Sequence, residues 1–428
     1  AKQEKEESEK QLAGFGIAYD EEIENLALTN GESKSSKTSG PMLIYSNKNG
    51  MVGKAYDYLV EDICDFEHKI IEITGISDIG LKYDPLLREI SGTPSQAGEF
   101  ELTLQYTREE SDAIHDNVKL CFFILPDPQS MWKNVEPPAD SLFKKAHFES
   151  LHETFHENRI YGGSLRGRSH AHAGTFRDDD FTIGIVSPDC LVLAVADGAG
   201  SAEFSREGSR IACDRVLDVA RKAYADKSES LWQMLEDMQV EMSHEIKQKV
   251  SSELHLTIGE MVKSSIEGIE ESAAQYEHSI RQYATTLLFA IVFKLEENYF
   301  IATYSIGDGA IGLVNDDTFK LLSSPDSGEF SGQTMFLTMK DSLVELNDRT
   351  KFSYLENLNG LCLMTDGISD PKFGTDSNLR KAEKWQELIG DVTTAGFCGA
   401  EYNEELFENW LGFFSKGDHD DRTIVFIA

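Results

Sequence analysis

Three short apolar runs in this chain each end or begin at an aspartate. They are residues 191–196 before Asp197, residues 361–365 before Asp366, and residues 424–427 after Asp420. Runs of this length and composition predict buried β-strands. An aspartate at the end of a buried core strand is badly placed for packing against apolar side chains. We therefore expect the three carboxylates to point at a shared position above a sheet.

Two further acidic clusters lie beside strand candidates. Asp178 and Asp179 precede residues 181–186, and Asp308 follows residues 299–304. Carboxylates that converge repel one another unless a cation lies between them. Hard oxygen ligands favour Mg²⁺ or Mn²⁺. The sequence therefore predicts a divalent metal site in the second half of the chain.

Six motifs occur in a fixed order. They are RDDDF, ADGAGS, ATTLLFAIV, SIGDGAIG, LMTDGISD and DDRTIVFI. Together they resemble the metal-dependent Ser/Thr protein phosphatases of type 2C, in a bacterial form. The resemblance covers about Phe143–Ala428 and implies an α+β fold, in which a central β-sandwich is flanked by helices.

The resemblance also implies the metal ligands. Asp197 matches the aspartate that bridges two ions, Gly198 matches a carbonyl ligand, and Asp366 and Asp420 match core ligands. Asp421 matches the position beside the last of these. Asp178 and Asp179 match the acidic pair, and Asp308 matches the aspartate of a third, weaker metal site. The implied cofactors are two core Mn²⁺ or Mg²⁺ ions and that third ion. Such ions activate a water molecule and neutralise charge that develops on phosphate.

The chain departs from the family pattern at the proton donor. Many eukaryotic members carry His directly after the first Asp-Gly, where this chain has Ala199. A serine alkoxide is a poor leaving group, so a proton source is needed. The candidates are His170, His172, His419 and a metal-bound water. His170 is predicted to face the site because it lies just before the acidic pair.

A second departure concerns the arginine that binds phosphate. Its family position, about four residues before the acidic pair, is Gly174 here. Arg166, Arg168 or Arg177 could replace it by bidentate contact with phosphate. Arg168 and Arg177 are the preferred candidates, and Arg177 could instead neutralise the acidic cluster.

The net charge of the chain disfavours some classes of binding partner. The net charge is −35 over 428 residues. A basic face is needed to bind nucleic acid or an anionic membrane surface, so neither partner is expected. No apolar run is long enough to span a bilayer and no secretory signal is visible. The dispersed cysteines indicate a reducing compartment, and we expect the cytoplasm.

Composition predicts four segments. They are a flexible polar tail at 1–40, an immunoglobulin-like β-sandwich at 41–126, a linker at 127–142, and the phosphatase-like domain at 143–428. The second segment resembles the bacterial immunoglobulin-like (cadherin-like) repeats through Gly92-Thr93-Pro94 and the following Ala97-Gly98. We expect this module either to bind a protein partner or to act as a spacer. Within the phosphatase-like domain, residues 263–277 read as an exposed connection, and residues 324–334 as a flap over the site or an ordinary surface loop.

Two functions are compatible with these features. The first is hydrolysis of phosphoserine and phosphothreonine in proteins, with phosphoproteins of a Ser/Thr kinase pathway as substrates. The second is a catalytically weak, phosphatase-shaped regulatory module that recruits a partner through its N-terminal sandwich. The presence of Asp197, Asp366 and Asp420 together favours catalysis.

Overall fold

The computed structural model describes residues 42–46, 48–60, 68–108, 111–224, 230–241, 243–315, 318–323, 334–339, 345–399 and 401–428. The predicted tail at 1–40 and most of the predicted flap lie outside these residues. The chain forms two compact units, Ala1–Lys133 and Asn134–Ala428, which are described separately.

The N-terminal unit contains two sheets. The first has the order β1 (Met42–Tyr45), β8 (Ser111–Leu125), β7 (Gly98–Arg108) and β4 (His68–Thr74), with β2 (Gly50–Met51) also paired to β8. The second has the order β3 (Tyr56–Leu59), β6 (Glu89–Gly92) and β5 (Leu81–Asp84). Alternate residues of both sheets form one core that includes Tyr58, Ile90, Leu104 and Phe122. Burying these side chains is what holds such a small unit together.

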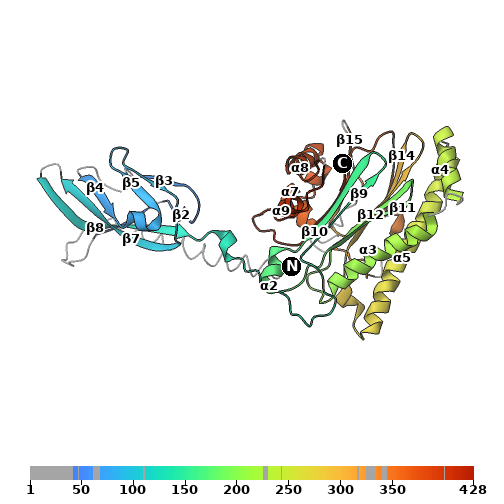
Figure 1. Ribbon diagram of the computed structural model, residues 1–428, viewed down its shortest axis with the longest axis horizontal. Helices are drawn as coiled ribbons and strands as arrows, with labels where there is room; N and C mark the ends of the chain where they lie inside the picture. The colour runs from blue at the N-terminus through green and yellow to red at the C-terminus, as the bar shows by residue number, and fades with distance from the viewer. Residues whose placement is uncertain are drawn as a thin grey trace. The chain divides into compact units, whose positions relative to one another are not determined.

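The C-terminal unit is built on two antiparallel sheets (Figure 1). One has the order β16 (Thr318–Leu321), β15 (Ala310–Asn315), β18 (Leu361–Met364), β19 (Arg422–Ile427), β10 (Asn158–Leu165) and β9 (Phe148–Phe155). The other has the order β11 (Asp180–Ser187), β12 (Cys190–Ala196), β13 (Leu287–Lys294), β14 (Tyr299–Ile306) and β17 (Thr350–Leu355). The sheets face each other across a core that contains Leu193, Leu288 and Val425.

Helices cover the outer face of each sheet (Figure 1). Those on the five-stranded sheet are α3 (Ser205–Tyr224), α4 (Ser230–Val240) and α5 (His244–Gln275). Those on the six-stranded sheet are α7 (Asp366–Phe373), α8 (Ala382–Thr394) and α9 (Glu404–Leu411). The described part of this unit also contains two short helices, α2 (Arg168–Ala173) and α6 (Leu346–Arg349). The predicted α+β sandwich flanked by helices is confirmed.

The strands form where the sequence is continuously apolar. Every residue of β12 is buried, because the two faces of this central strand pack against the opposite sheet and against α3. Strands buried on both faces lack the polar alternation of half-exposed strands. None of the described helices is long and apolar enough to cross a membrane.

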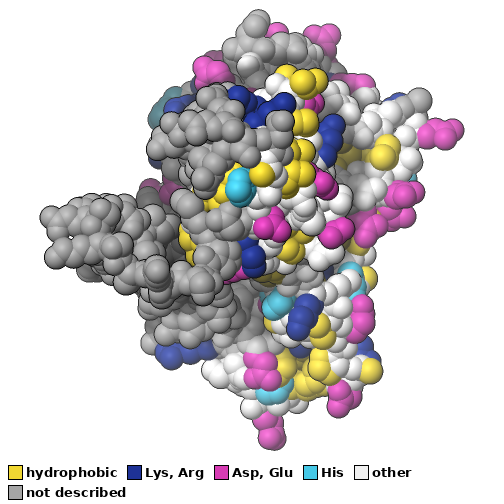
Figure 2. Space-filling model, turned by 90° about the vertical axis from the view of Figure 1, so that its left-hand side faces the viewer, with side chains coloured by type: hydrophobic (Ala, Val, Ile, Leu, Met, Phe, Trp, Pro, Cys, Tyr) yellow, Lys and Arg dark blue, Asp and Glu magenta, His cyan; other side chains and the backbone are white. Residues whose placement is uncertain are grey.

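Acidic and basic side chains are mixed on the molecular surface. On the face shown in Figure 2, the magenta acidic and dark blue basic side chains of the described residues are interspersed. The whole chain carries a net charge of −35.

Candidate metal centre

Strand ends bring the predicted aspartates to one edge of the C-terminal sandwich. Asp197 follows β12, Asp308 follows β14, and Asp366 begins α7 directly after β18. The strand pairs β12–β13, β13–β14 and β18–β19 run antiparallel, which brings these ends and the start of β19 together. The first three carboxylates offer ligand atoms that all lie within 4.8 Å of one another. These oxygens could hold a divalent cation.

Hydrogen bonds fix the first of these loops. The amide of Asp197 donates to Thr286 Oγ1 at 2.8 Å, and Thr285 Oγ1 donates to the Asp197 carbonyl at 2.8 Å. Gly198, the next residue, forms an isolated bridge with Thr285. Because these threonine side chains bind the backbone of Asp197, they hold its carboxylate directed into the site. Asp308 is positioned in a similar way, because Thr334 Oγ1 donates to its Oδ2 at 2.6 Å.

The carboxylates of this group raise one another's pKa. Burial, followed by the charges of Asp366 and Asp179, raises the pKa of Asp197 well above its usual value. Burial and the nearby Asp308 and Asp420 do the same to the pKa of Asp366. A divalent ion between the carboxylates would remove the repulsion and favour the ionised forms.

The acidic pair, Asp178 and Asp179, lies beside these carboxylates. Hydrogen bonds to its backbone and side chains hold it in place. Both residues are buried, and Thr365 Oγ1 donates to Asp179 Oδ2 at 2.8 Å. Burial and the charge of Asp421 raise the pKa of Asp179 to about 7. Burial also raises the pKa of Asp178, to about 6, against the opposing charge of His170.

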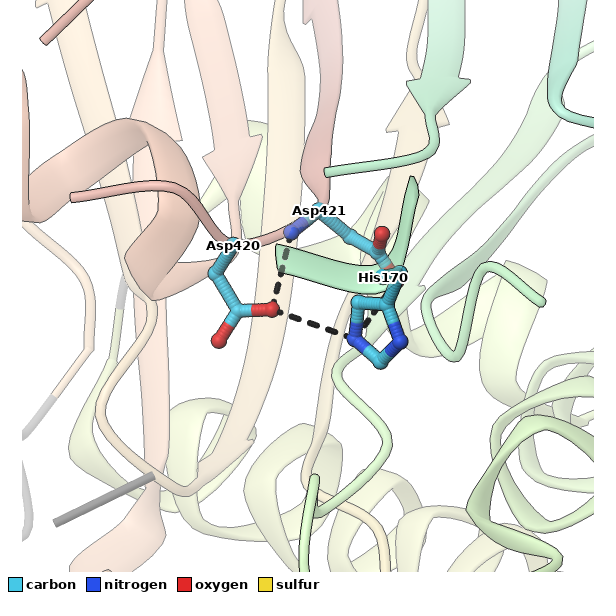
Figure 3. Close-up of side chains that lie close together, drawn as sticks. All are labelled: His170, Asp420 and Asp421. Carbon is cyan, nitrogen blue, oxygen red and sulfur yellow. Dashed lines mark hydrogen bonds and ion pairs between the residues drawn. The ribbon is translucent and has the colours of Figure 1, made fainter. Parts of the chain in front are cut away.

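His170 faces a second acidic group (Figure 3). Its Nε2 lies 3.5 Å from Asp420 Oδ1, 3.8 Å from Asp421 Oδ2 and 4.0 Å from Asp178 Oδ2. Its Nδ1 lies 2.8 Å from the hydroxyl of Thr175. Burial alone would lower the pKa of His170, but these carboxylates raise it to about 10. In return, although burial opposes it, His170 holds the pKa of Asp420 below its usual value.

Asp421 connects three loops through its carboxylate. Oδ1 accepts the Gly167 amide at 2.6 Å, and Oδ2 accepts the amides of Asp178 and Asp179 at 2.6 and 3.2 Å. The side chain is 1% exposed. These three bonds fix the carboxylate, which also offers a ligand atom within 4.8 Å of those of His170 and Asp420, so its metal contact stays a prediction.

The predicted arginines differ in placement. Arg177 is fully buried, where it donates to the Ser164 carbonyl and pairs with Glu149. Its guanidinium is therefore not available to phosphate, because strand β9 supplies the carboxylate that it binds. Arg168 donates to the Gly412 carbonyl at 2.8 Å and lies over the ring of Phe414.

The remaining candidates lie around α2. Arg166 donates to the carbonyls of Val135 and His170, at 2.7 and 3.0 Å. His172 is exposed. The ring of His419 packs beside Phe414, and burial lowers its pKa. Of the three predicted histidines, the structure brings His170 to the acidic groups.

Sequence reasoning missed a supporting arginine. Arg422 is buried and donates to the carbonyls of Gly367 and Asp418 and to Ser415 Oγ. It thereby ties the start of β19, which directly follows Asp420 and Asp421, to the start of α7, which carries Asp366. Its place directly after Asp420-Asp421 was the available signal.

A family model identifies the family to which the chain belongs. The family model of protein phosphatase 2C matches residues 166–411, which is more than half of the chain. The chain belongs to this family. No curated protein matches it.

Several solved structures are similar. Serine/threonine phosphatase Stp1 from Staphylococcus aureus is 12% identical, with 69% of this chain and 99% of that chain covered and a TM-score of 0.37. Serine-threonine phosphatase 2C from Toxoplasma gondii is 15% identical, with 65% and 98% covered and a TM-score of 0.38. The catalytic domain of PstP, solved with two manganese ions, is 16% identical, with 65% and 97% covered and a TM-score of 0.33.

Proposed function

We propose that this chain hydrolyses phosphoserine and phosphothreonine in proteins with the help of Mn²⁺ or Mg²⁺. One observation carries the proposal: Asp197, Asp308 and Asp366, from three separate strand ends, place their oxygens within 4.8 Å of one another. Such a half-buried group of like charges is unfavourable without a cation. The family membership of the chain supports the same activity.

The donor set fits hard divalent ions. Asp197, Asp366 and Asp420 would hold the two core ions, with the Gly198 carbonyl and the acidic pair contributing, and Asp308 would serve a further ion. All of these groups offer oxygen, which suits Mn²⁺ and Mg²⁺. When bound, such ions supply an activated water and neutralise charge on the phosphoryl group.

The chain's own residues supply the remaining roles. His170 Nε2 lies between the carboxylates of Asp420 and Asp178, and from this position we propose that it delivers a proton to the departing serine or threonine oxygen. Thr365 and Asp421 hold the acidic pair in place. Arg168 remains the proposed contact for phosphate, because Arg177 is engaged with Glu149.

Hydrolysis assays test the proposal. Phosphate release from p-nitrophenyl phosphate and from a phosphothreonine peptide is measured with Mn²⁺, with Mg²⁺ and with chelator. We expect metal-dependent turnover that falls at least 100-fold in Asp366→Asn. The matched control is Asp376→Asn, an exposed aspartate just beyond α7, which should retain full activity. Absence of turnover from folded protein in either metal would favour the regulatory-module alternative.

We also propose that residues 41–126 form an immunoglobulin-like module that binds a protein partner or acts as a spacer. Two facing sheets with a shared core support this. The proposed substrates are phosphoproteins of a cognate Ser/Thr kinase pathway. A cytoplasmic location is proposed because Cys121, Cys190, Cys213 and Cys362 are buried free thiols.

A further inference from the structure

A segment that precedes the family-matched region lies against the candidate metal centre. The match begins at residue 166, whereas residues 134–147 already belong to the C-terminal unit. Lys145, near the end of this segment, has a side chain only 6% exposed. A lysine is seldom buried to this extent unless its ammonium is fully paired.

The ammonium of Lys145 has three partners, all next to proposed metal ligands. It lies 2.7 Å from Asp180 Oδ2, and it donates to the Asp179 carbonyl at 2.9 Å and to Ser209 Oγ at 3.0 Å. Lysine has three N–H donors, so this arrangement uses all of them. The site is therefore built for an ammonium group and not merely tolerant of one.

The network extends to the first residue of the acidic pair. Ser209, on α3, donates its hydroxyl to the carbonyl of Asp178. Lys145 and Ser209 thus hold two successive carbonyls, those of Asp178 and Asp179. Because the backbone of Asp178 and Asp179 is held, the directions in which their two carboxylates point are also held.

The same segment also reaches α2, which carries His170. The Val135 amide donates to the Ala171 carbonyl at 2.8 Å. Arg166 bridges the carbonyls of Val135 and His170. Both sides of the acidic centre are therefore supported by residues that lie before the family match.

We propose that Lys145 is a positioning residue for metal binding, which it serves by holding the backbone of Asp178 and Asp179. This inference rests on the proposed function, since it assumes that these aspartates help to bind the ions. Partners that orient metal ligands contribute about 10- to 100-fold in affinity or activity.

Electrostatics and positioning predict opposite results for loss of this lysine. Removing a positive charge beside a cation site should strengthen metal binding if charge alone matters. Losing the backbone contacts should instead weaken it, because the acidic pair would no longer be held. The sign of the change therefore distinguishes positioning from simple repulsion.

Calorimetric titration of the full chain with Mn²⁺ tests the inference. We expect the Kd to rise about 10- to 100-fold in Lys145→Met and to be partly restored in Lys145→Arg. The control is Lys144→Met, because Lys144 is the exposed neighbour and should bind Mn²⁺ as the wild type does. Ser209→Ala, which removes one hydroxyl from the same network, should weaken binding in the same direction and covers the case in which Lys145→Met does not fold.

The outcomes separate the two claims. A Kd for Lys145→Met equal to or lower than that of the wild type, with Ser209→Ala also unchanged, would overturn the positioning role and leave the proposed function intact. A wild-type chain that binds no Mn²⁺ would overturn the proposed function, and the inference with it.

Discussion

At the scale of single residues, the candidate centre carries more negative charge than it can easily hold alone. Burial and neighbouring carboxylates raise the pKa values of Asp197 and Asp366 well above their usual range. In the metal-free protein, these proposed metal ligands should therefore lower the free energy of unfolding.

Asp366→Asn should stabilise the metal-free protein while it abolishes activity. The neutral amide has a similar shape and removes one charge from the repelling group. With chelator present at pH 7.5, we expect the free energy of unfolding to rise by about 1 kcal/mol or more. Urea denaturation measures this, with the exposed Asp376→Asn as control. A loss of stability in chelator would mean that the Asp366 carboxylate is not under repulsion.

The acidic pair predicts how the metal-free protein responds to pH. In the folded state the pKa is about 6 for Asp178 and about 7 for Asp179, above the usual 3.8. Between the unfolded and folded pKa values, the folded state thus binds more protons than the unfolded state. The contribution of the two aspartates to stability therefore falls as pH rises from about 4 to 7. Urea denaturation in chelator should show this fall, and saturating Mn²⁺ should reduce it. A fall of equal size with and without Mn²⁺ would contradict the placement of the ions beside this pair.

At the scale of elements, the junction between β18 and α7 is tightly packed. Gly367 follows Asp366, and a Cβ at this position would overlap the carbonyl oxygen of Asp421. Backbone atoms cannot move aside as a flexible side chain can. The start of α7 and the segment before β19 are therefore interlocked, together with the aspartates that they carry.

Gly367→Ala should disrupt both segments at once. We expect a loss of about 3 kcal/mol in the free energy of unfolding and markedly weaker Mn²⁺ binding. Gly390→Ala is the matched control, because an added Cβ meets no atom within 4 Å in α8 and a helical Ala is more stable by about 0.5–1 kcal/mol. Denaturation and Mn²⁺ titration of both variants check this, and equal stability of the two would refute the interlock.

Some of these elements could be predicted from sequence and others could not. Apolar runs that stop at Asp197 and Asp366 identify strands and their functional ends, because burial and charge change abruptly there. Residues 263–277 were expected to be an exposed connection, but most of them belong to α5 (His244–Gln275), with Ser265, Gly268 and Ile269 buried. Their small and polar side chains conceal a helix face that packs closely on α3.

Long-range pairing explains the errors at the site. Arg177 precedes a strand in an irregular segment, where no periodicity fixes the direction of its side chain. Its orientation is set by Glu149, which lies 28 residues away. Lys145 meets Asp180 over a similar separation. A single sequence does not encode such contacts in any local pattern.

At the scale of the whole molecule, the two compact units have separate cores. The N-terminal core contains only residues before Lys133, and the three cores of the C-terminal unit contain only residues after it. A unit with its own core is expected to fold alone.

Residues 41–133 should therefore fold without the rest of the chain. We expect an all-β circular dichroism spectrum and one cooperative thermal transition. Residues 134–428, which retain the Lys145 segment, should keep Mn²⁺ affinity within a few-fold of the full chain. A non-cooperative melt of the first fragment, or loss of binding by the second, would show that the units depend on each other.

The position of bound Mn²⁺ tests the proposed metal centre most sharply. Anomalous diffraction from crystals grown with Mn²⁺ should show two strong peaks contacted by Asp197, Asp366 and Asp420. Asp197 and Asp366 lie in the group of oxygens that the strand ends bring together, and Asp420 is the third proposed core ligand. Crystals of the folded protein with no anomalous peak at this edge of the sandwich, at saturating Mn²⁺, would rule out the proposed metal centre.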